Sequence, residues 1–281
     1  MRPESQPDRR LLRPADLDPS AIALVTGASS GLGEAFAWAL AALGWSLVLT
    51  ARRQDRLEAL AKALRSAHGV SVTVVSLDLA QPDAVGHLTD TIRQQGLKVA
   101  VLINNAGYGL PGDLNRLAPG AAEAQIQVML TAPVHLCRAA LQDMQALNFG
   151  RLINVGSVAG FLPASPGNTL YAPIKSFLVG LTRGIRLENT QDNILISILC
   201  PGFTYTEFHD HTDEKDFSRL FPKAFWMSAT RVVEISLQKN SRNCFMIIPG
   251  LINKSITQIL KFNPIPMFNL LYKLSHTLNN K

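Results

Sequence analysis

A tyrosine, a lysine and a serine in the second half of the chain have the types and spacing needed for acid–base chemistry. Tyr171 and Lys175 are four residues apart, so on a helix their side chains lie one above the other on the same face. A phenol with a pKa of about 10 is a poor proton donor or base at neutral pH, but a nearby cation lowers that pKa. Ser157 follows an apolar run, where its hydroxyl could hydrogen-bond a substrate oxygen. We therefore take Ser157, Tyr171 and Lys175 as candidate catalytic residues.

A Tyr-x3-Lys pair arises often by chance, and here Pro173 lies between the two residues. Proline has no backbone N–H and fits best in the first turn of a helix. The helix is therefore predicted to begin close to Tyr171, which would leave the phenol at an accessible helix tip.

A glycine-rich turn near the N-terminus points to a nucleotide. The segment Thr26–Gly33 (TGASSGLG) follows an apolar run and precedes a helical pattern, with Gly27, Gly31 and Gly33 in the spacing Gly-x3-Gly-x-Gly. Such a turn lets the backbone approach a pyrophosphate, and the following helix N-terminus offers unpaired N–H groups and a favourable dipole. The turn predicts a dinucleotide site, with an ordinary tight turn as the alternative.

The residues after the second apolar run bear on which dinucleotide is bound. Sites for NAD usually place an acidic residue about 20 residues after the glycines, where it binds the ribose 2′-hydroxyl. This chain has Arg52 and Arg53 there instead. Guanidinium groups suit a dianionic 2′-phosphate, so the predicted cofactor is NADP(H), with NAD(H) less favoured. The alternative is that both arginines form only the charged first turn of an exposed helix.

Short apolar runs alternate with longer segments of helical period along residues 21–252. This alternation predicts an α/β fold: a single doubly wound Rossmann-fold domain, with a mainly parallel sheet of about seven strands and helices on both faces. Residues 1–20 are expected to be a flexible leader and residues 253–281 a C-terminal extension. The predicted strands are residues 21–26, 45–50, 71–77, 98–104, 151–155, 194–200 and 244–248, and the predicted helices are residues 31–43, 53–68, 82–95, 120–147 and 169–189.

Composition excludes several classes of protein. With 281 residues, 47% of them apolar and 17% charged, the chain can bury a large core, which excludes disorder as its main state. No run of about 18 or more apolar residues occurs, so no transmembrane helix is expected. The leader has no apolar centre typical of a secretion signal, and three distant cysteines suit a reducing compartment, so we expect a cytoplasmic protein. The net charge of +6 is too diffuse to indicate a nucleic-acid partner.

Several motifs occur in an order that is found in one known family. They are Thr26–Gly33 (TGASSGLG), residues 77–79 (LDL), residues 104–107 (NNAG), Ser157, Tyr171-x3-Lys175 and Pro201-Gly202. In these motifs the chain resembles the short-chain dehydrogenase/reductase superfamily, from Ala21 to Ile252. The resemblance implies an NADP(H)-dependent oxidoreductase that transfers hydride between the nicotinamide and a carbonyl or alcohol substrate, with reduction as the favoured direction.

The resemblance also implies a role for each matching residue. Tyr171 would be the catalytic acid/base, Ser157 would anchor the carbonyl oxygen, and Lys175 would bind the nicotinamide ribose and lower the tyrosine pKa. The expected cofactor-lining residues are Gly27, Ser29, Ser30, Gly31, Leu32 and Gly33 around the pyrophosphate and adenosine ribose, Asp78 and Leu79 at the adenine, Asn105, Ala106 and Gly107 after the fourth strand, Tyr171 and Lys175, and Pro201, Gly202, Thr204 and Thr206 at the nicotinamide.

One residue departs from the family pattern. Family members carry an asparagine in the long helix before the fifth strand, where it takes part in a proton relay through water to the lysine. Met129 occupies the matching position here, and a thioether sulfur is only a weak acceptor. The departure motivates an alternative function, a catalytically weak NADP(H)-binding regulator or scaffold with the same fold.

The substrate side of the chain leaves more than one interpretation open. Residues 203–226 match the family's substrate lid and are rich in aromatic side chains, which suits a lipophilic substrate or plain hinge packing equally. His209 and His211 have no third ligand nearby, so no metal site is expected. The stretch from Leu251 to Lys281 could contact a membrane surface, although packing on the domain is favoured. The resemblance implies a homo-dimer or homo-tetramer assembled through the helices at residues 120–147 and 169–189.

Overall fold

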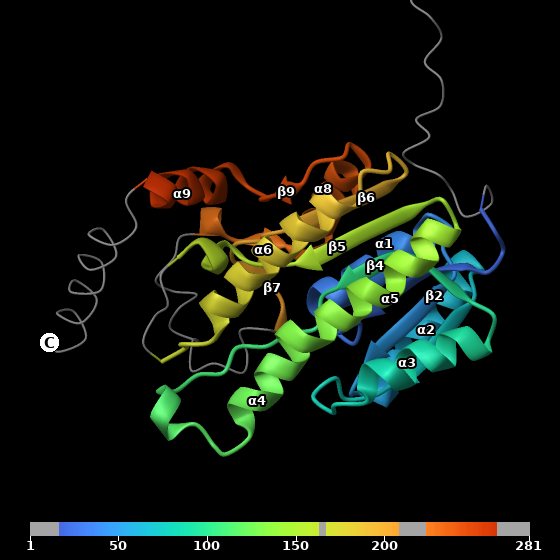
Figure 1. Cartoon of the computed structure of the whole chain (residues 1–281), viewed down its shortest axis with the longest axis horizontal. Coiled ribbons are helices and arrows are strands. Elements are labelled where there is room, and N and C mark those ends of the chain that lie inside the picture. The colour runs from blue at the N-terminus through green and yellow to red at the C-terminus, as the bar shows by residue number, and fades with distance from the viewer. Residues whose placement is uncertain (1–16, 163–166, 208–222, 263–281) are drawn as a thin grey trace, which may run out of the picture.

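A seven-stranded parallel sheet forms the centre of the molecule (Figure 1). The computed structural model describes residues 17–162, 167–207 and 223–262. The strand order is β3-β2-β1-β4-β5-β6-β9, so the direction of winding reverses between β1 and β4, which confirms the predicted doubly wound α/β fold. The strands are β1 (Ala21–Thr26), β2 (Leu47–Ala51), β3 (Val72–Ser76), β4 (Lys98–Asn104), β5 (Gly150–Val155), β6 (Ile194–Leu199) and β9 (Met246–Ile247).

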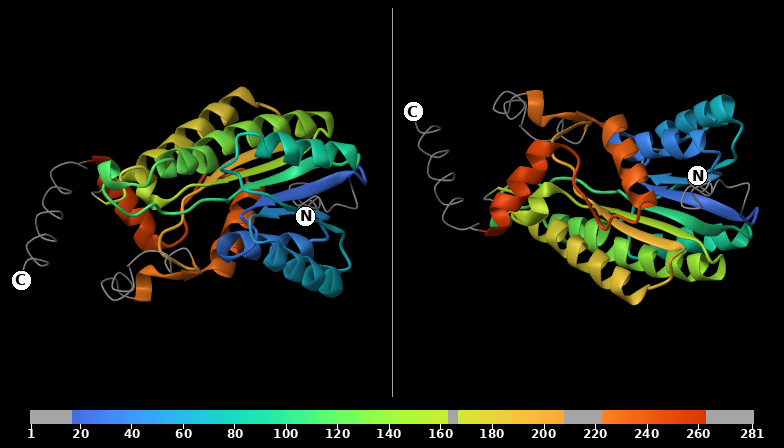
Figure 2. Two further views of the ribbon diagram at one scale, coloured as in Figure 1. Left: turned by 90° about the horizontal axis from the view of Figure 1, so that it is seen from below. Right: turned by 90° about the horizontal axis from the view of Figure 1, so that it is seen from above.

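Helices cover both faces of this sheet, as Figure 2 shows in two views along its edge. The apolar side chains of each strand alternate between two separate cores, one under each helical layer. One layer contains α1 (Gly31–Ala42), α2 (Gln54–His68) and α8 (Ala229–Ser241), and the other contains α3 (Ala84–Gln94), α5 (Ala132–Ala146) and α6 (Tyr171–Glu188).

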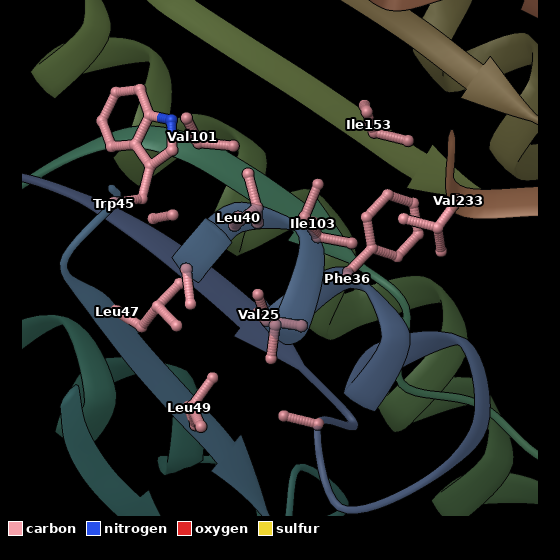
Figure 3. Close-up of a cluster of buried hydrophobic side chains, with 14 of the residues drawn as sticks. Val25, Phe36, Leu40, Trp45, Leu47, Leu49, Val101, Ile103, Ile153 and Val233 are labelled. Atoms are coloured by element: carbon pink, nitrogen blue, oxygen red, sulfur yellow. The ribbon is translucent and has the colours of Figure 1, made fainter. Parts of the chain in front are cut away.

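The core under α1 packs the start of the chain onto the centre of the sheet. Figure 3 shows Phe36 and Leu40 of α1 together with Val25, Ile103 and Ile153 of the strands. All five side chains are almost completely buried. Because α1 starts directly after β1, this packing also fixes the direction in which its N-terminus points, toward the carboxyl edge of the sheet.

The opposite core contains a chain of buried polar side chains. Asn104 and Asn154 are register partners on β4 and β5, and the Asn104 amide donates to Oδ1 of Asn154 at 2.8 Å. The amide of Asn154 in turn donates to Oγ1 of Thr182 on α6 at 2.9 Å. Asn154 and Thr182 are fully buried. The network ties the carboxyl ends of two central strands to the helix that begins with Tyr171.

The predicted helix over residues 120–147 contains a π-helical turn in the structure. Helix α4 (Ala121–Ile126) is followed by a π-helical turn (Gln127–Thr131) and then by α5. Pro133 has no N–H to donate to the carbonyl of Met129 four residues before it, so a regular α-helix cannot continue through this point. The predicted extent of the helix is therefore confirmed, whereas the π-helical turn at its centre was not predicted.

The sequence did not predict every element after the sixth strand. The structure adds α8, the short strands β7 (Thr204–Tyr205) and β8 (Met227–Ser228), and α9 (Leu251–Phe262), while the last sheet strand is shorter than expected. Asn253 and Thr257 of α9 are buried, so this helix packs on the domain in its described part. Two-residue strands carry too little periodicity to be recognised, and α8 mixes polar residues into its buried face.

Several predictions concern residues outside the described ranges. They include most of the leader, residues 208–222 of the proposed lid with His209 and His211, and residues 263–281 of the extension. Within the described ranges, no helix is long and apolar enough to span a bilayer, and no metal-binding group of histidine, cysteine and acidic residues is found. All three cysteines lie in the described ranges, and none of them forms a disulfide.

The buried polar network predicts a specific loss of stability. Asn154→Ala should lower the free energy of unfolding by about 2–3 kcal/mol, because it leaves the Asn104 amide and the Thr182 hydroxyl without this partner. Urea unfolding measures the change. Gln145→Ala is the control, because Gln145 donates an exposed hydrogen bond to Asn189 and should cost no more than about 0.5 kcal/mol. Equal small losses in both variants would show that the network contributes little.

Candidate active site

The predicted site residues follow the carboxyl ends of neighbouring strands. Because all seven strands are parallel, these ends meet at one edge of the sheet, where doubly wound proteins bind their ligands. The structure therefore brings together segments that are far apart in sequence. They are residues 27–33 after β1, Arg52 and Arg53 after β2, Asp78 and Leu79 after β3, Asn105–Gly107 after β4, Ser157 after β5, and Pro201 and Gly202 after β6.

The glycine turn after β1 has the geometry that only glycine supports. Gly27 and Gly31 have φ values of +64° and +60°, in the left-handed region. A Cβ on Gly33 would collide with the carbonyl oxygen of Gly27. The three glycines therefore let the chain fold tightly back on itself and leave the first N–H groups of α1 accessible to an anion.

Side chains from β1 and β4 hold this turn in place. The amide of Asn105 donates to the carbonyl oxygens of Thr26, at 2.9 Å, and Gly27, at 3.2 Å. The hydroxyl of Thr26 accepts the backbone N–H groups of Asn105 and Ala106, each at 3.0 Å. The sequence placed Asn105 and Ala106 beside the cofactor, and the structure shows that they also join the two strands at which the winding reverses.

The adenine side is less completely formed by side chains. Oδ1 of Asp78 accepts the N–H of Ala80 at 3.0 Å, which bends the chain after β3. Leu79 is buried and packs in the core under α3 and α5. Contacts of Asp78 and Leu79 with an adenine stay a prediction.

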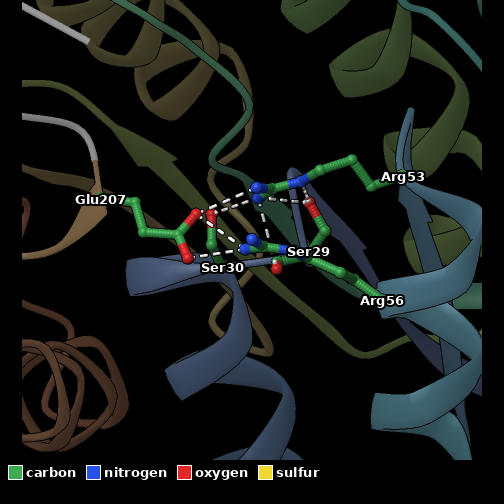
Figure 4. Close-up of polar contacts among 5 residues, drawn as sticks. All are labelled: Ser29, Ser30, Arg53, Arg56 and Glu207. Atoms are coloured by element: carbon green, nitrogen blue, oxygen red, sulfur yellow. Dashed lines mark hydrogen bonds and ion pairs between the residues drawn. The ribbon is translucent and has the colours of Figure 1, made fainter. Parts of the chain in front are cut away.

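Arg53 lies over the glycine turn and is surrounded by hydrogen-bond acceptors (Figure 4). Its Nη2 donates to Oγ of Ser30 at 2.8 Å and to Oγ of Ser29 at 3.0 Å. Its Nη1 donates to Glu207 at 2.9 Å, and Arg56 donates to the same carboxylate at 2.6 Å. Hydrogen bonds from Arg56 and Arg53 hold the pKa of Glu207 below its usual value.

The sequence reasoning missed Arg56 and Glu207. Arg56 stands in an ordinary charged helical segment, and Glu207 is 151 positions away from it. No local periodicity connects two such residues, so only the folded chain could bring them together. The side chain of Arg52, by contrast, is exposed.

The tyrosine and lysine lie at the start of α6, as predicted. The helix begins at Tyr171, and Pro173 lies in its first turn, where the missing N–H breaks no helical hydrogen bond. The ammonium of Lys175 is 5.6 Å from the centre of the Tyr171 ring. Its Nζ donates to the carbonyl oxygen of Val155, at the end of β5, at 2.8 Å. The pairing expected from the four-residue spacing is therefore present.

Burial changes the acidity of this lysine. Lys175 is only 4% exposed, and burial lowers its pKa from 10.5 to about 8, although the nearby Cys200 acts in the opposite direction. An ammonium with a pKa of about 8 can lose and regain a proton near physiological pH. Most structural lysines keep their charge in water, so a buried one next to a tyrosine indicates a functional site.

Ser157 is held next to α6 by a close backbone contact. It precedes the short 3₁₀ helix η5 (Val158–Phe161), and its Oγ accepts the N–H of Ala159 at 3.1 Å. A Cβ on Gly160 would lie 2.9 Å from the carbonyl carbon of Lys175, so glycine is needed for η5 to approach α6. The N–H of Val158 donates to the carbonyl oxygen of Pro201 at 3.0 Å, which joins the ends of β5 and β6.

Met129 fills the place where the family pattern has asparagine. Its side chain is 1% exposed, and a Cβ on Gly107 would lie 3.2 Å from its methyl carbon. Its sulfur accepts the N–H of Tyr108 at 3.4 Å, and the amide of Gln125 donates to the carbonyl oxygen of Tyr108 at 2.9 Å. The methionine is therefore a packed side chain of the turn after β4, bonded to backbone and not to solvent.

The turn after β6 has a partner that the sequence did not indicate. A Cβ on Gly202 would collide with the side chain of Asn253, whose amide donates to the carbonyl oxygen of Pro249 at 2.8 Å. Helix α9 therefore contacts the turn predicted to lie at the nicotinamide. Nearby, the ring of Trp226 stacks on Phe203 at 5.2 Å and on Tyr205 at 5.1 Å.

The buried ammonium predicts a pH-dependent contribution to stability. The folded-state pKa of Lys175, about 8, lies below its ordinary value of 10.5, so between these values the unfolded chain binds more protons. Below pH 8 the buried charge therefore lowers the free energy of unfolding by its full amount. This destabilisation disappears as the pH rises toward 10.5. The difference in unfolding free energy between Lys175→Met and the unmodified protein should fall by about 3 kcal/mol from neutral to alkaline pH.

Urea unfolding over that pH range measures the difference. Lys62→Met on the exposed side of α2 is the control and should give a difference that does not vary with pH. If the difference in unfolding free energy for Lys175→Met is also independent of pH, burial does not disfavour the charged form of Lys175.

Comparisons with known proteins agree with this arrangement. Residues 21–216 match the family profile described as short chain dehydrogenase. An uncharacterized oxidoreductase of Staphylococcus saprophyticus is 34% identical over 239 residues, which cover 82% of this chain and 96% of that protein. A short-chain dehydrogenase from Sphingobium yanoikuyae in complex with NADPH is 28% identical with a TM-score of 0.74, covering 93% of this chain and 95% of its own. A short chain dehydrogenase/reductase from Burkholderia phymatum in complex with NAD is 27% identical with a TM-score of 0.74. The match covers 85% of this chain and 92% of that one.

The matched profile spans more than half of the chain and contains both the glycine turn and the Tyr171–Lys175 pair. The strand order and the relatives' similarity over most of the chain point the same way. The chain therefore belongs to the short-chain dehydrogenase/reductase superfamily.

Proposed function

We propose that this protein is an NADP(H)-dependent oxidoreductase that interconverts a carbonyl compound and an alcohol. The observation that carries the proposal is the position of the buried Lys175 ammonium, 5.6 Å from the Tyr171 ring. This pair stands at the same sheet edge as the glycine turn. A proton-transfer group and a nucleotide cradle at one edge are what such a reaction requires.

The residues at this edge fit a nicotinamide dinucleotide. The left-handed glycines and the N-terminus of α1 suit its pyrophosphate, and Arg53 suits a phosphate on its adenosine ribose. When bound, the nicotinamide supplies or accepts the hydride. The residues that would hold the dinucleotide are those predicted from the sequence, with Tyr171 and Lys175 toward its nicotinamide ribose.

The protein itself contributes the proton donor and the groups that orient the substrate and stabilise the phenolate. In reduction, the carbonyl carbon gains a hydride, and the carbonyl oxygen takes the proton of the Tyr171 hydroxyl, which leaves the tyrosine as phenolate. The Ser157 hydroxyl donates a hydrogen bond to the same oxygen and orients it. The Lys175 ammonium stabilises the phenolate by its charge, and alcohol oxidation runs these steps in reverse.

The cofactor preference rests on the environment of Arg53. The guanidinium of Arg53 lies beside the hydroxyls of Ser29 and Ser30, and these three groups can all hydrogen-bond a 2′-phosphate. The two residues directly after β2 are arginines and not the acid that is typical of an NAD site. The related structures contain either NADPH or NAD, so the preference for NADP(H) is ours.

The nature of the substrate is inferred from the aromatic stack. Phe203, Tyr205 and Trp226 lie together just after β6, where they would contact a lipophilic carbonyl compound. Assembly into a homo-dimer or homo-tetramer through α5 and α6, and a location in the cytoplasm, stay predictions from the sequence.

A regulator or scaffold that binds NADP(H) but turns over slowly is the second candidate. Met129 is the observation that favours it, because its buried thioether cannot replace an amide in a water-mediated proton relay. The Tyr171–Lys175 pair is in place with Met129 present, and for that reason we prefer the enzyme.

The decisive variant is Tyr171→Phe. Removal of the proton donor should lower NADPH-dependent carbonyl reduction by at least about 100-fold, while the dissociation constant for NADP⁺ should stay within about twofold. Rates are measured by NADPH oxidation over aldehydes, ketones, steroid-like ketones and acyl ketones. Ser176→Ala, which removes an exposed hydroxyl from the same helix, should leave the rate unchanged.

Two results would contradict the enzymatic function. If Tyr171→Phe retains the full rate, the tyrosine is not the proton donor. If the unmodified protein binds NADP⁺ but reduces none of these compounds, the regulator is the better description. In that case Met129→Asn tests the reason, because recovery of turnover would assign the loss to the missing relay residue.

A further inference from the structure

The carboxylate of Glu207 occupies the guanidinium groups next to the glycine turn. Its Oε2 is 2.9 Å from Nη1 of Arg53, and its Oε1 is 2.6 Å from Nη1 of Arg56 (Figure 4). Arg53 simultaneously donates to the hydroxyls of Ser29 and Ser30 in the turn. An anion from a distant part of the chain thus lies where two cations and two hydroxyls converge.

Backbone pairing and side-chain packing of the preceding residues set the position of Glu207. The N–H of Met227 donates to the carbonyl oxygen of Phe203 at 3.0 Å, and strands β7 and β8 pair directly before Glu207. The side chain of Thr206 packs against the glycine turn, because a Cβ on Gly31 would lie 3.1 Å from it. This segment therefore directs the Glu207 carboxylate toward the arginines.

A carboxylate and a phosphate compete for the same donors. Both accept two hydrogen bonds from a guanidinium, and both are attracted by its permanent charge. Two anions cannot share one pair of guanidinium groups without strong repulsion. A 2′-phosphate that engages Arg53 must therefore displace the carboxylate of Glu207.

The 2′-hydroxyl of NAD(H) does not compete with a carboxylate for the guanidinium groups as a phosphate does. It is uncharged and can donate a hydrogen bond to a carboxylate, which is the interaction that NAD sites usually obtain from an acid after the second strand. Glu207 brings a carboxylate from the segment after β6 to Arg53, in the segment that follows β2. NAD(H) can therefore bind without breaking the contacts of Glu207 with Arg53 and Arg56.

We propose that Glu207 is a specificity-determining residue that competes with the 2′-phosphate for Arg53 and Arg56 and so reduces the preference for NADP(H) over NAD(H). This inference rests on the proposed dinucleotide function. Glu207 does not touch the reacting atoms. Its effect is on cofactor choice and not on the chemical step.

The variant Glu207→Gln tests the competition. It keeps the side-chain shape and an acceptor oxygen but removes the charge. The side chains of Arg53, Arg56 and Glu207 are 38%, 45% and 41% exposed, and exposed ion pairs contribute little to stability, so the variant should fold. Isothermal titration of the full chain with NADP⁺ and NAD⁺, which differ only in the 2′-phosphate, provides the readout.

The dissociation constant for NADP⁺ should fall several-fold in Glu207→Gln, on the order of tenfold at low ionic strength, and the gain should shrink as salt is added. The dissociation constant for NAD⁺ should stay the same or rise. The ratio of the two constants therefore moves toward NADP⁺, and a purely structural ion pair would not change that ratio.

Glu234→Gln is the matched control. Glu234 forms an exposed ion pair with Arg231 at 2.9 Å, the same distance as Glu207 to Arg53, and its loss changes the net charge by the same amount. It should leave both affinities unchanged. Equal effects of the two variants would mean that only net charge matters, and would overturn the inference.

The remaining outcomes separate this inference from the proposed function. If the unmodified protein binds both cofactors and Glu207→Gln leaves the NADP⁺ affinity unchanged or weaker, the inference alone fails. If neither cofactor binds to the unmodified protein or to the variant, the dinucleotide function fails and the inference fails with it.

Discussion

The pairing of β1 with β4 is the constraint on which the site depends. These neighbours in the sheet are separated by β2 and β3 in the chain, so the segments that follow them leave in opposite directions and open a space at the carboxyl edge. The hydroxyl of Thr26 and the amide of Asn105 bridge this boundary, and they shape the glycine turn as they do so. The same two side chains thus join the ends of these two strands and shape the glycine turn.

The catalytic side of the site is built by a second set of contacts across neighbouring strands. The carbonyl oxygen of Val155 receives the Lys175 ammonium, and Gly160 allows η5 to lie directly on α6. The buried network of Asn104, Asn154 and Thr182 joins β4 and β5 to α6. A charged amine is held in an apolar environment by this rigid surrounding, and its lowered pKa is the consequence.

Charge is arranged differently at the adenosine side. The side chains of Arg53 and Arg56 are partly exposed, and their partner Glu207 comes from a segment about 150 residues later in the chain. The site therefore combines a buried ammonium at Lys175 with a set of partly exposed charges at Arg53, Arg56 and Glu207. Fold alone does not imply function, so both parts have to be argued from their own residues.

The sequence by itself determined three features: the doubly wound α/β fold, the glycine turn and the Tyr171–Lys175 pair. These depend on short-range rules: a left-handed backbone at Gly27 and Gly31, a four-residue helical spacing, and apolar runs long enough to be buried strands. The π-helical turn at residues 127–131 and the elements β7, β8 and α8 were not predicted from the sequence. Short or mixed elements of this kind depend on what packs against them and not on a local pattern. Only the tertiary structure decided that Glu207 would meet Arg53 and Arg56 and that Asn253 would lie on Gly202. Those contacts join segments that are distant in the chain, and their geometry is fixed by the order of strands in the sheet and not by any local pattern of residues.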